Sequence, residues 1–267
     1  IFTNVATTED NQPWWEGKLD GKPAKDWQGR TYDETAGKAA HPNSRFTVPA
    51  TNNPSYSSLA EAPEGVPISA IVFGGRRKQV APLVYQAKDW EHGVLIGAST
   101  ASETTAAMVG DVGVVRRDPM AMKPFCGYNF ADYWAHWLTF PDRSEHLPHI
   151  FHVNWFRQNE QGDFLWPGFG ENLRVLEWII ERCEGRADAE ETAIGFLPHV
   201  DDINTTDLDI DPATLKELLT VNGEQWRAEM ASVLEYLESY GERLPEELKV
   251  QQKIIAEALD VELAKAS

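Results

Sequence analysis

A short apolar run stopped by two glycines constrains the fold of this chain more than any other feature of its sequence. Residues 68–73 (ISAIVF) have the length and β-branched content of a buried strand. Gly74 and Gly75 end this run, and Arg76 and Arg77 follow. In α/β folds the carboxyl end of such a strand faces the crevice that binds ligands. The pattern therefore predicts a sheet with arginines at its binding edge.

The rest of the sequence alternates between strand-like and helix-like segments, which favours the α/β class. Strands are expected at residues 82–85, 93–97 and 150–156, with a hairpin turn at 158–162 and a return strand at 164–166. Helices are expected at residues 128–140, 170–185 and throughout 186–267. The sequence thus predicts an α/β, mixed-sheet domain over residues 1–185 that ends in a helical region over residues 186–267 of the same domain.

Composition limits the partners that this chain can have. Its 267 residues carry a formal net charge of −18, which repels nucleic acid and anionic membranes at long range. Two cysteines without CxxC spacing argue against a disulfide framework, and no apolar run reaches the roughly 18 residues of a membrane span. We therefore expect a cytoplasmic protein, in which any site for an anion is a local cluster of basic groups.

Two segments lack regular patterning. Residues 7–67 are rich in Gly, Pro, Asn and Ser, and a loop region of this length is usually functional or disordered. Residues 97–108 contain no large apolar anchor before Met108 and are expected to form a mobile loop. The chain opens with Ile1, and residues 1–5 read as a strand already under way, which suggests a fragment of a longer protein.

Four stretches occur together in one order. They are residues 41–46 (HPNSRF), residues 73–77 (FGGRR), residues 125–130 (FCGYNF), and residues 151–157 (FHVNWFR) followed by residues 164–172 (FLWPGFGEN). In these motifs the chain resembles the GTP-dependent phosphoenolpyruvate carboxykinases, from Ile1 to about Trp178. The resemblance implies that family's nucleotide-binding fold and its carboxy-lyase reaction, in which oxaloacetate and GTP give phosphoenolpyruvate, CO₂ and GDP.

The first stretch carries candidate substrate contacts. If residues 43–45 are extended, Asn43 and Arg45 point to one face, where an amide and a guanidinium suit a carboxylate or a phosphoryl group. Residue types alone favour a plain surface arginine beside a turn-forming asparagine. The resemblance implies that Asn43, Ser44 and Arg45 bind oxaloacetate or phosphoenolpyruvate. It also implies that Arg45 is catalytic and approaches the transferred phosphate.

The second stretch places Arg76 behind a strand and two glycines. An arginine there can stabilise charge on a moving phosphoryl group, although a surface ion pair fits the spacing as well. The resemblance implies that Arg76 is catalytic and contacts the triphosphate. Arg77 is expected to point away, because one of two adjacent arginines generally does.

Aromatic residues of the fourth stretch would ordinarily belong to a core, but these flank a turn and a glycine-rich segment. Rings in such places can stack on a planar base, and an amide at a helix start can hydrogen-bond its edge. The resemblance implies a guanine pocket formed by Phe156, Phe164, Phe169, Gly170, Glu171 and Asn172. In this pocket the Asn172 carbonyl would accept from guanine N1–H. Residues 97–108 would be a lid that excludes water.

The resemblance implies cofactors that this chain holds only in part. GTP or GDP would occupy the pocket with Mg²⁺, whereas a P-loop and the Mn²⁺ ligands would precede Ile1. No G-x-x-x-x-G-K-[ST] motif occurs in the sequence. We assign no metal site, because Pro148 interrupts the spacing of His146, His149 and His152. The chain alone is therefore expected to be inactive, and the complete gluconeogenic or anaplerotic enzyme to be a monomer.

A second function class stays open. Ten tryptophans and the missing P-loop also fit a non-catalytic purine-nucleotide-binding or sugar-binding module. A sugar-binding module would not need the arginines Arg45 and Arg76, which therefore discriminate between the two hypotheses.

Overall fold

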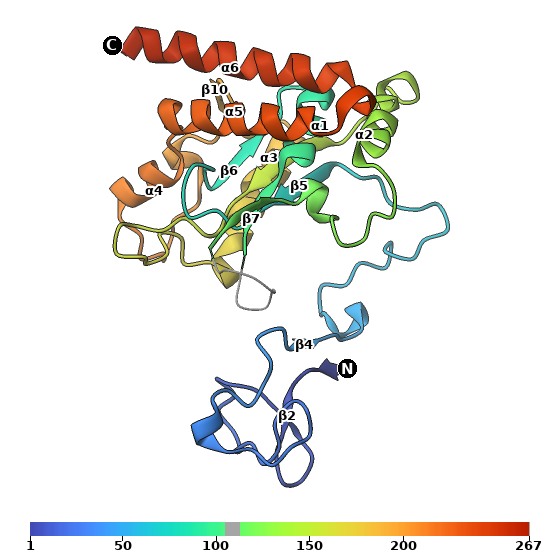
Figure 1. Cartoon of the computed structure of the whole chain (residues 1–267), viewed down its shortest axis with the longest axis vertical. Helices are drawn as coiled ribbons and strands as arrows, with labels where there is room; N and C mark the ends of the chain where they lie inside the picture. The colour runs from blue at the N-terminus through green and yellow to red at the C-terminus, as the bar shows by residue number, and fades with distance from the viewer. Residues whose placement is uncertain (105–112, 267) are drawn as a thin grey trace. The chain divides into compact units, whose positions relative to one another are not determined.

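The computed structural model describes residues 1–104 and 113–266, which divide into two compact units (Figure 1). The first unit contains residues 1–67 with Thr104 and Gly113, and the second contains residues 68–103 and 114–266. No helix in these described ranges is long and apolar enough to cross a bilayer.

The first unit consists mostly of turns, as its lack of patterning predicted. Its regular elements are β1 (Phe2–Thr3) paired with β4 (Arg45–Phe46), β2 (Ala6–Thr7) paired with β3 (Pro13–Trp14), and the 3-10 helices η1 (Glu34–Ala36) and η2 (Ala50–Asn52). Aromatic contacts hold the segments together: Phe2 stacks on Trp15 with ring centroids 5.8 Å apart, and Trp27 meets His41 edge-on at 4.7 Å.

The second unit contains a mixed five-stranded sheet, as predicted. Its strands, in spatial order, are β10 (Glu190–Thr192), β11 (Gly195–Leu197), β6 (Val84–Gln86), β9 (His149–Val153) and β5 (Ala70–Gly74). Only β5 and β9 are parallel, and the other neighbours in this sheet are antiparallel. A separate antiparallel ribbon joins β7 (Ala101–Glu103) to β8 (Val115–Arg117).

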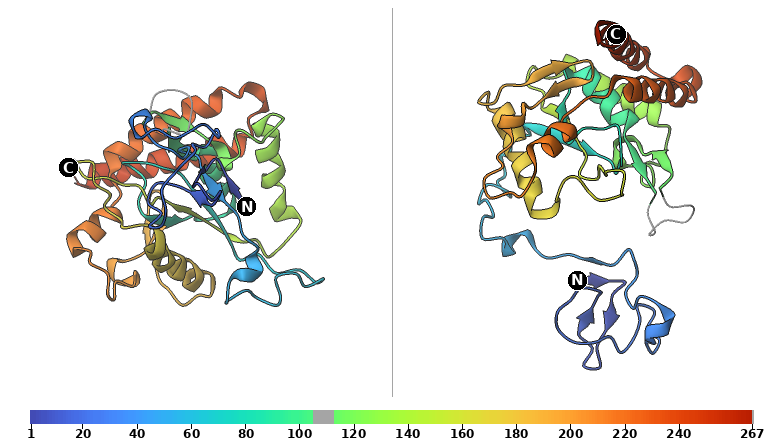
Figure 2. Two further views of the ribbon diagram at one scale, coloured as in Figure 1. Left: turned by 90° about the horizontal axis from the view of Figure 1, so that it is seen from below. Right: turned by 90° about the vertical axis from the view of Figure 1, so that its left-hand side faces the viewer.

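Helices cover both faces of this sheet. The first layer contains α1 (Trp90–Ser99), α2 (Phe130–Leu138), α5 (Gly223–Glu238) and α6 (Glu246–Ala266); the second contains α3 (Asn172–Cys183) and α4 (Pro212–Leu218). Figures 1 and 2 show α5 and α6 running side by side. Strand β9 divides the two cores, because Ile150 packs into the first whereas Phe151 and Val153 pack into the second. The described connections include η3 (Pro119–Ala121), η4 (Phe140–Asp142), η5 (Phe169–Glu171), η6 (Val200–Asp202) and η7 (Gly241–Arg243).

The strand predicted at residues 93–97 is wrong, because these residues belong to α1. The helix is buried from His92 to Ala98, so no polar face reveals its period. A Cβ at Gly93 would lie 2.3 Å from Ile150 Cδ1, and one at Gly97 would lie 2.7 Å from the Phe73 ring. The glycines therefore serve close packing of this helix on the sheet.

The loop predicted at residues 97–108 is also wrong for most of its described residues. Residues 97–99 end α1, and residues 101–103 form β7. The rest of the predicted lid, residues 105–108, lies outside the described residues.

The region after residue 185 is not wholly helical, contrary to the prediction. The β10–β11 hairpin joins the sheet, with Phe196 pairing with Gln86 of β6. The apolar run in this hairpin is too short for a helix, and its short length indicates a strand. Conversely, residues 164–166 form no return strand: the turn at 158–162 closes with one isolated bridge, between Gln158 and Phe164.

Candidate functional site

Two loops meet at one edge of the sheet because β5 and β9 run parallel and end side by side. The loop after β5 passes close to β7, where a Cβ at Gly75 would lie 2.0 Å from the Ala101 carbonyl oxygen. The Arg76 backbone N–H donates to Ser102 Oγ at 3.1 Å. A cavity of about 300 Å³ opens here, lined by Gly74, Gly75, Arg76, Ser102, Val153, Trp155 and Phe156.

Asn154, which follows β9, fixes the two loops to each other. Its side chain is fully buried, and its Oδ1 accepts from the backbone N–H groups of Arg77 and Phe156, each at 3.2 Å. Its Nδ2 donates at 2.9 Å to the carbonyls of Arg77 and Ala81. All these bonds are to backbone, so Asn154 sets the loop geometry. This role of Asn154 was not predicted, although a polar residue beside a buried apolar run is a signal for it.

Arg76, Phe156 and Phe164 come together at this edge. The Arg76 guanidinium carbon lies 4.5 Å from the centre of the Phe156 ring, a cation–π contact. Phe164 meets Phe156 edge-on at 6.1 Å and is 58% exposed. Within the described residues no carboxylate pairs with Arg76, so its charge is available to an anion.

Phe169 and Asn172 lie at the start of α3. The Phe169 side chain is 99% exposed, and its backbone has a φ of 49°, which is costly for a residue with a Cβ. Asn172 is the first residue of α3 and so lies in its first turn, as predicted, and its Oδ1 accepts from Trp166 Nε1 at 2.9 Å. Gly170 precedes it, while the Glu171 carboxylate pairs with Arg174. Phe169 has no ring contact with Phe156 or Phe164.

Arg77 turns inward, as expected, and joins a buried ion cluster. Both of its terminal nitrogens bind the Glu229 carboxylate of α5, at 3.0 and 2.8 Å, and Arg117 Nη1 lies 2.6 Å from the same group. Burial raises the pKa of the Glu229 carboxyl, but its hydrogen bonds and charge interactions with Arg77 and Arg117 prevail and lower the pKa to about 2. Sequence reasoning missed Glu229, because 152 residues separate it from Arg77.

His152 lies beside this cluster. Its ring stacks on Tyr85 at 5.1 Å, and burial together with the charge of Arg77 lowers its pKa to about 4. His149 instead meets the Gln86 amide. No group of three or more His, Cys, Asp or Glu side chains in the described ranges could hold a metal ion.

The predicted substrate residues belong to the first unit. Arg45 Nε donates to Asn43 Oδ1 at 3.1 Å, which puts both side chains on one face of the segment. The Ser44 backbone N–H donates to the His41 carbonyl at 2.9 Å. Arg45 is exposed and has no ion pair among the described residues.

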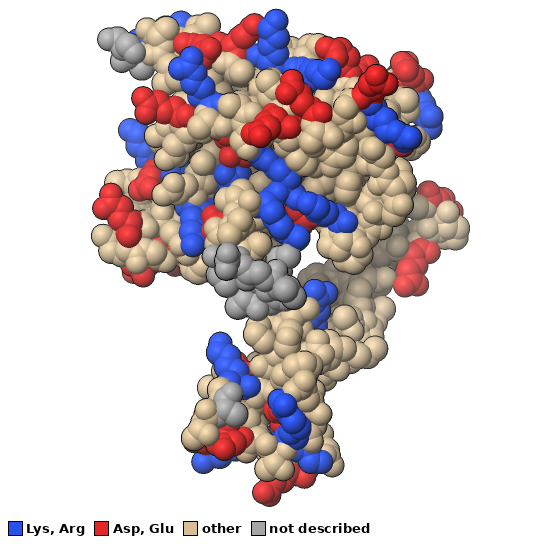
Figure 3. All heavy atoms as spheres, viewed as in Figure 1, with Lys and Arg blue, Asp and Glu red and all other residues tan. Residues whose placement is uncertain are grey.

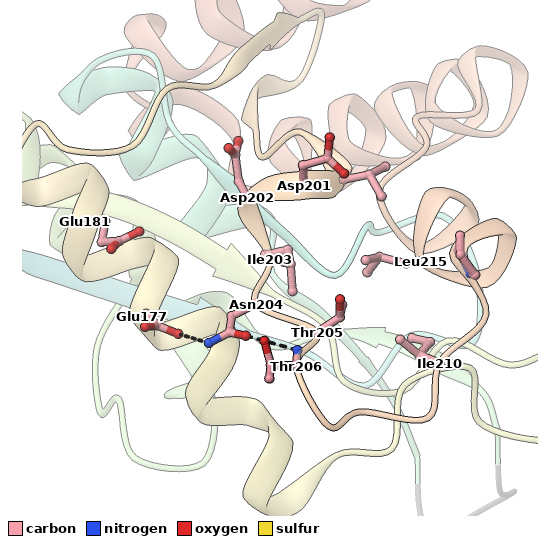
Figure 4. Close-up of a pocket in the computed structure, with 12 residues that line it drawn as sticks. Glu177, Glu181, Asp201, Asp202, Ile203, Asn204, Thr205, Thr206, Ile210 and Leu215 are labelled. Atoms are coloured by element: carbon pink, nitrogen blue, oxygen red, sulfur yellow. Dashed lines mark hydrogen bonds between the residues drawn. The ribbon is translucent and has the colours of Figure 1, made fainter.

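The candidate site and a larger cavity of the second unit differ in the charge of their side chains. In Figure 3 basic side chains gather near the centre of the second unit, whereas both signs alternate over its helices. The larger cavity, of about 530 Å³, has Glu177 and Glu181 on α3 and Asp201 and Asp202 on η6 (Figure 4). Four carboxylates repel a triphosphate, and none of the predicted site residues lines this cavity.

Comparison with known proteins gives the family. A family model described as "Phosphoenolpyruvate carboxykinase C-terminal P-loop domain" matches residues 1–258, well beyond the motif-bearing region. Enzymes named phosphoenolpyruvate carboxykinase [GTP] are similar to this chain: that of Chlamydia pneumoniae is 52% identical over 93% of the chain, and that of Arthrobacter sp. (strain FB24) is 49% identical over 97%. The chain spans 42–43% of the length of these relatives. It belongs to the GTP-dependent phosphoenolpyruvate carboxykinase family and matches that family's C-terminal domain.

Proposed function

We propose that this chain supplies the guanine pocket and two phosphate- and substrate-binding arginines of an enzyme that converts oxaloacetate and GTP to phosphoenolpyruvate, CO₂ and GDP. The observation that carries the proposal is the group formed by Arg76, Phe156 and Phe164. A guanidinium that has no carboxylate partner among the described residues, stacked on one ring beside a second exposed ring, suits a ligand with a planar base and an anionic tail.

The chemistry needs charge stabilisation rather than proton transfer. Loss of CO₂ from oxaloacetate leaves the electron pair of the broken C–C bond in an enolate. The enolate oxygen attacks the γ-phosphorus, the bond from phosphorus to the bridging oxygen breaks, and GDP leaves. In this proposal Arg76 neutralises charge on the triphosphate. Asn43, Ser44 and Arg45 hold the substrate carboxylate, with Arg45 also near the transferred phosphoryl group.

The described residues near the start of α3 fit a nucleotide. Exposed rings at Phe164 and Phe169 suit the base, and Gly170, Glu171 and Asn172 form the adjoining start of α3. For Mn²⁺ the described residues offer no ligand cluster. We therefore propose that the Mn²⁺ ligands lie elsewhere in a longer protein, and that Mg²⁺ arrives with the nucleotide. A gluconeogenic or anaplerotic role in the cytoplasm belongs to the same proposal.

The sugar-binding alternative loses four of the ten tryptophans on which it rests. Trp134, Trp166, Trp178 and Trp226 are buried in the cores and cannot stack on a sugar ring. A non-catalytic purine-binding module would use the same rings as the proposed enzyme, so only turnover separates these two functions.

The test is an assay of the full-length protein that contains this chain. We expect oxaloacetate-dependent formation of GDP from GTP, with little ADP from ATP. Binding of GTP without turnover would favour the non-catalytic module, and failure to bind any purine nucleotide would overturn the assignment of the pocket.

A further inference from the structure

We propose that Trp166 is a positioning residue that sets the choice of base, because its indole N–H fixes the orientation of the Asn172 amide. The inference rests on the proposed guanine pocket. Trp166 Nε1 donates to Asn172 Oδ1 at 2.9 Å. Trp166 is 1% exposed and lies in the same buried cluster as Val175 and Trp178, so its ring cannot turn away.

The amide group of an asparagine can turn by 180° with almost no change in shape, which exchanges its donor and its acceptor. An indole nitrogen is a donor only. If the Asn172 amide turned over, its NH₂ group would face the N–H of Trp166, and the buried indole would lose its only hydrogen bond among the described residues. The contact therefore keeps one of the two amide orientations.

Guanine and adenine need opposite orientations of such an amide. Guanine offers O6 as an acceptor and N1–H as a donor, whereas adenine offers N6–H₂ as a donor and N1 as an acceptor. An amide that can turn over pairs with either edge, but a fixed amide pairs with one. Asn172 supplies the hydrogen bond, and Trp166 prevents the turned-over state that would accept adenine.

A matched pair of variants tests this role in the full-length enzyme. Trp166→Phe keeps a large ring and removes the N–H, so the ratio of kcat/KM for GTP to that for ATP should fall about five- to tenfold, the value of one lost hydrogen bond. Trp178→Phe is the control: Trp178 is fully buried in the same cluster, and its Nε1 has no hydrogen-bond partner in the described part of the chain. Its ratio should stay at the wild-type value.

A purely structural role would change both nucleotides equally and leave the ratio unchanged, which would overturn the inference. In an Asn172→Ala background Trp166→Phe should leave the ratio unaltered, because no amide remains to be oriented; a persisting effect would contradict the mechanism. Replacing Trp166 with β-(3-benzothienyl)alanine exchanges the N–H for sulfur at the same ring size. If both replacements unfold the protein, Trp166 is a packing residue and the inference fails. A wild-type enzyme without any GTP preference would instead refute the proposed function.

Discussion

The loop after β5 contributes one arginine to the exposed group with Phe156 and Phe164, and the next arginine to the buried ion cluster around Glu229. Arg76 lies over the Phe156 ring without a carboxylate partner among the described residues, whereas Arg77 is clamped by Glu229 and is almost fully buried. Asn154 holds the backbone between them. Adjacent residues of one type thus have different surroundings: an unpaired guanidinium can serve a ligand, whereas a buried one needs its carboxylate partner.

The largest expected effect is on turnover at the exposed edge. Arg76→Ala in the full-length enzyme should lower kcat/KM for GTP about 10³-fold, about 4 kcal/mol, as expected for an arginine that neutralises a phosphoryl transition state. The free energy of unfolding should change by less than about 0.5 kcal/mol. Lys78→Ala removes a charge two residues away and should act only weakly. An equal loss of kcat/KM in both variants would mean that the positive potential of the loop, and not a direct contact of Arg76 with the phosphates, supports turnover.

The ion cluster should respond in the opposite way. Glu229→Gln leaves Arg77 and Arg117 without their shared carboxylate and should lower the free energy of unfolding by about 2–4 kcal/mol, measured by urea unfolding. Asp260→Asn breaks the exposed pair with Arg227 and should cost less than about 1 kcal/mol. Similar small losses in both variants would show that burial adds nothing to the Glu229 pair.

The same cluster should give an acid-dependent stability. Because folding lowers the pKa of Glu229 to about 2, its contribution of about 3 kcal/mol is complete above pH 4.5 and is lost as pH falls from 4.5 towards 2. His92 and His152, with pKa values lowered to about 4, destabilise the fold over an earlier window, as pH falls from 6.5 to 4. We therefore expect the urea midpoint of Glu229→Gln to lose its pH dependence below pH 4.5 and to keep that between pH 4.5 and 6.5, in measurements from pH 2.5 to 7. If the midpoint of this variant still falls below pH 4.5 as steeply as that of the wild type, the assignment to Glu229 is wrong.

The smallest expected effect concerns Phe169, where a substitution should change GTP affinity and stability in opposite directions. Phe169→Gly removes an exposed ring and relieves a positive φ, so GTP affinity should fall about tenfold while stability rises by up to about 1 kcal/mol. Phe125 is also an exposed phenylalanine, 82% exposed, and Phe125→Ala should leave GTP affinity unchanged. Calorimetric titration with GTP measures both variants. Unchanged affinity in Phe169→Gly would remove this ring from the pocket.

Local sequence patterns predicted much of the fold. The strand predicted at 68–73 and the helices predicted at 128–140 and 170–185 are confirmed, because each has a period and a clear end. Helix α1 was mistaken for a strand because burial on all sides removes that period, although Asp89, which caps the His92 N–H at 2.8 Å, was a usable sign. The β10–β11 hairpin was missed because its pairing partner, Gln86, is over a hundred residues away in the chain.

The sequence by itself determined the family, the glycine-arginine loop at the end of a strand, and the aromatic residues that we propose for the base. Only the tertiary structure decided which arginine has no carboxylate partner among the described residues, which carboxylate binds the other, and which atom of Asn172 accepts from Trp166. The reason is physical. Periodicity and turn chemistry act over a few neighbouring residues, whereas the state of a charge or an amide depends on partners that packing brings from distant parts of the chain.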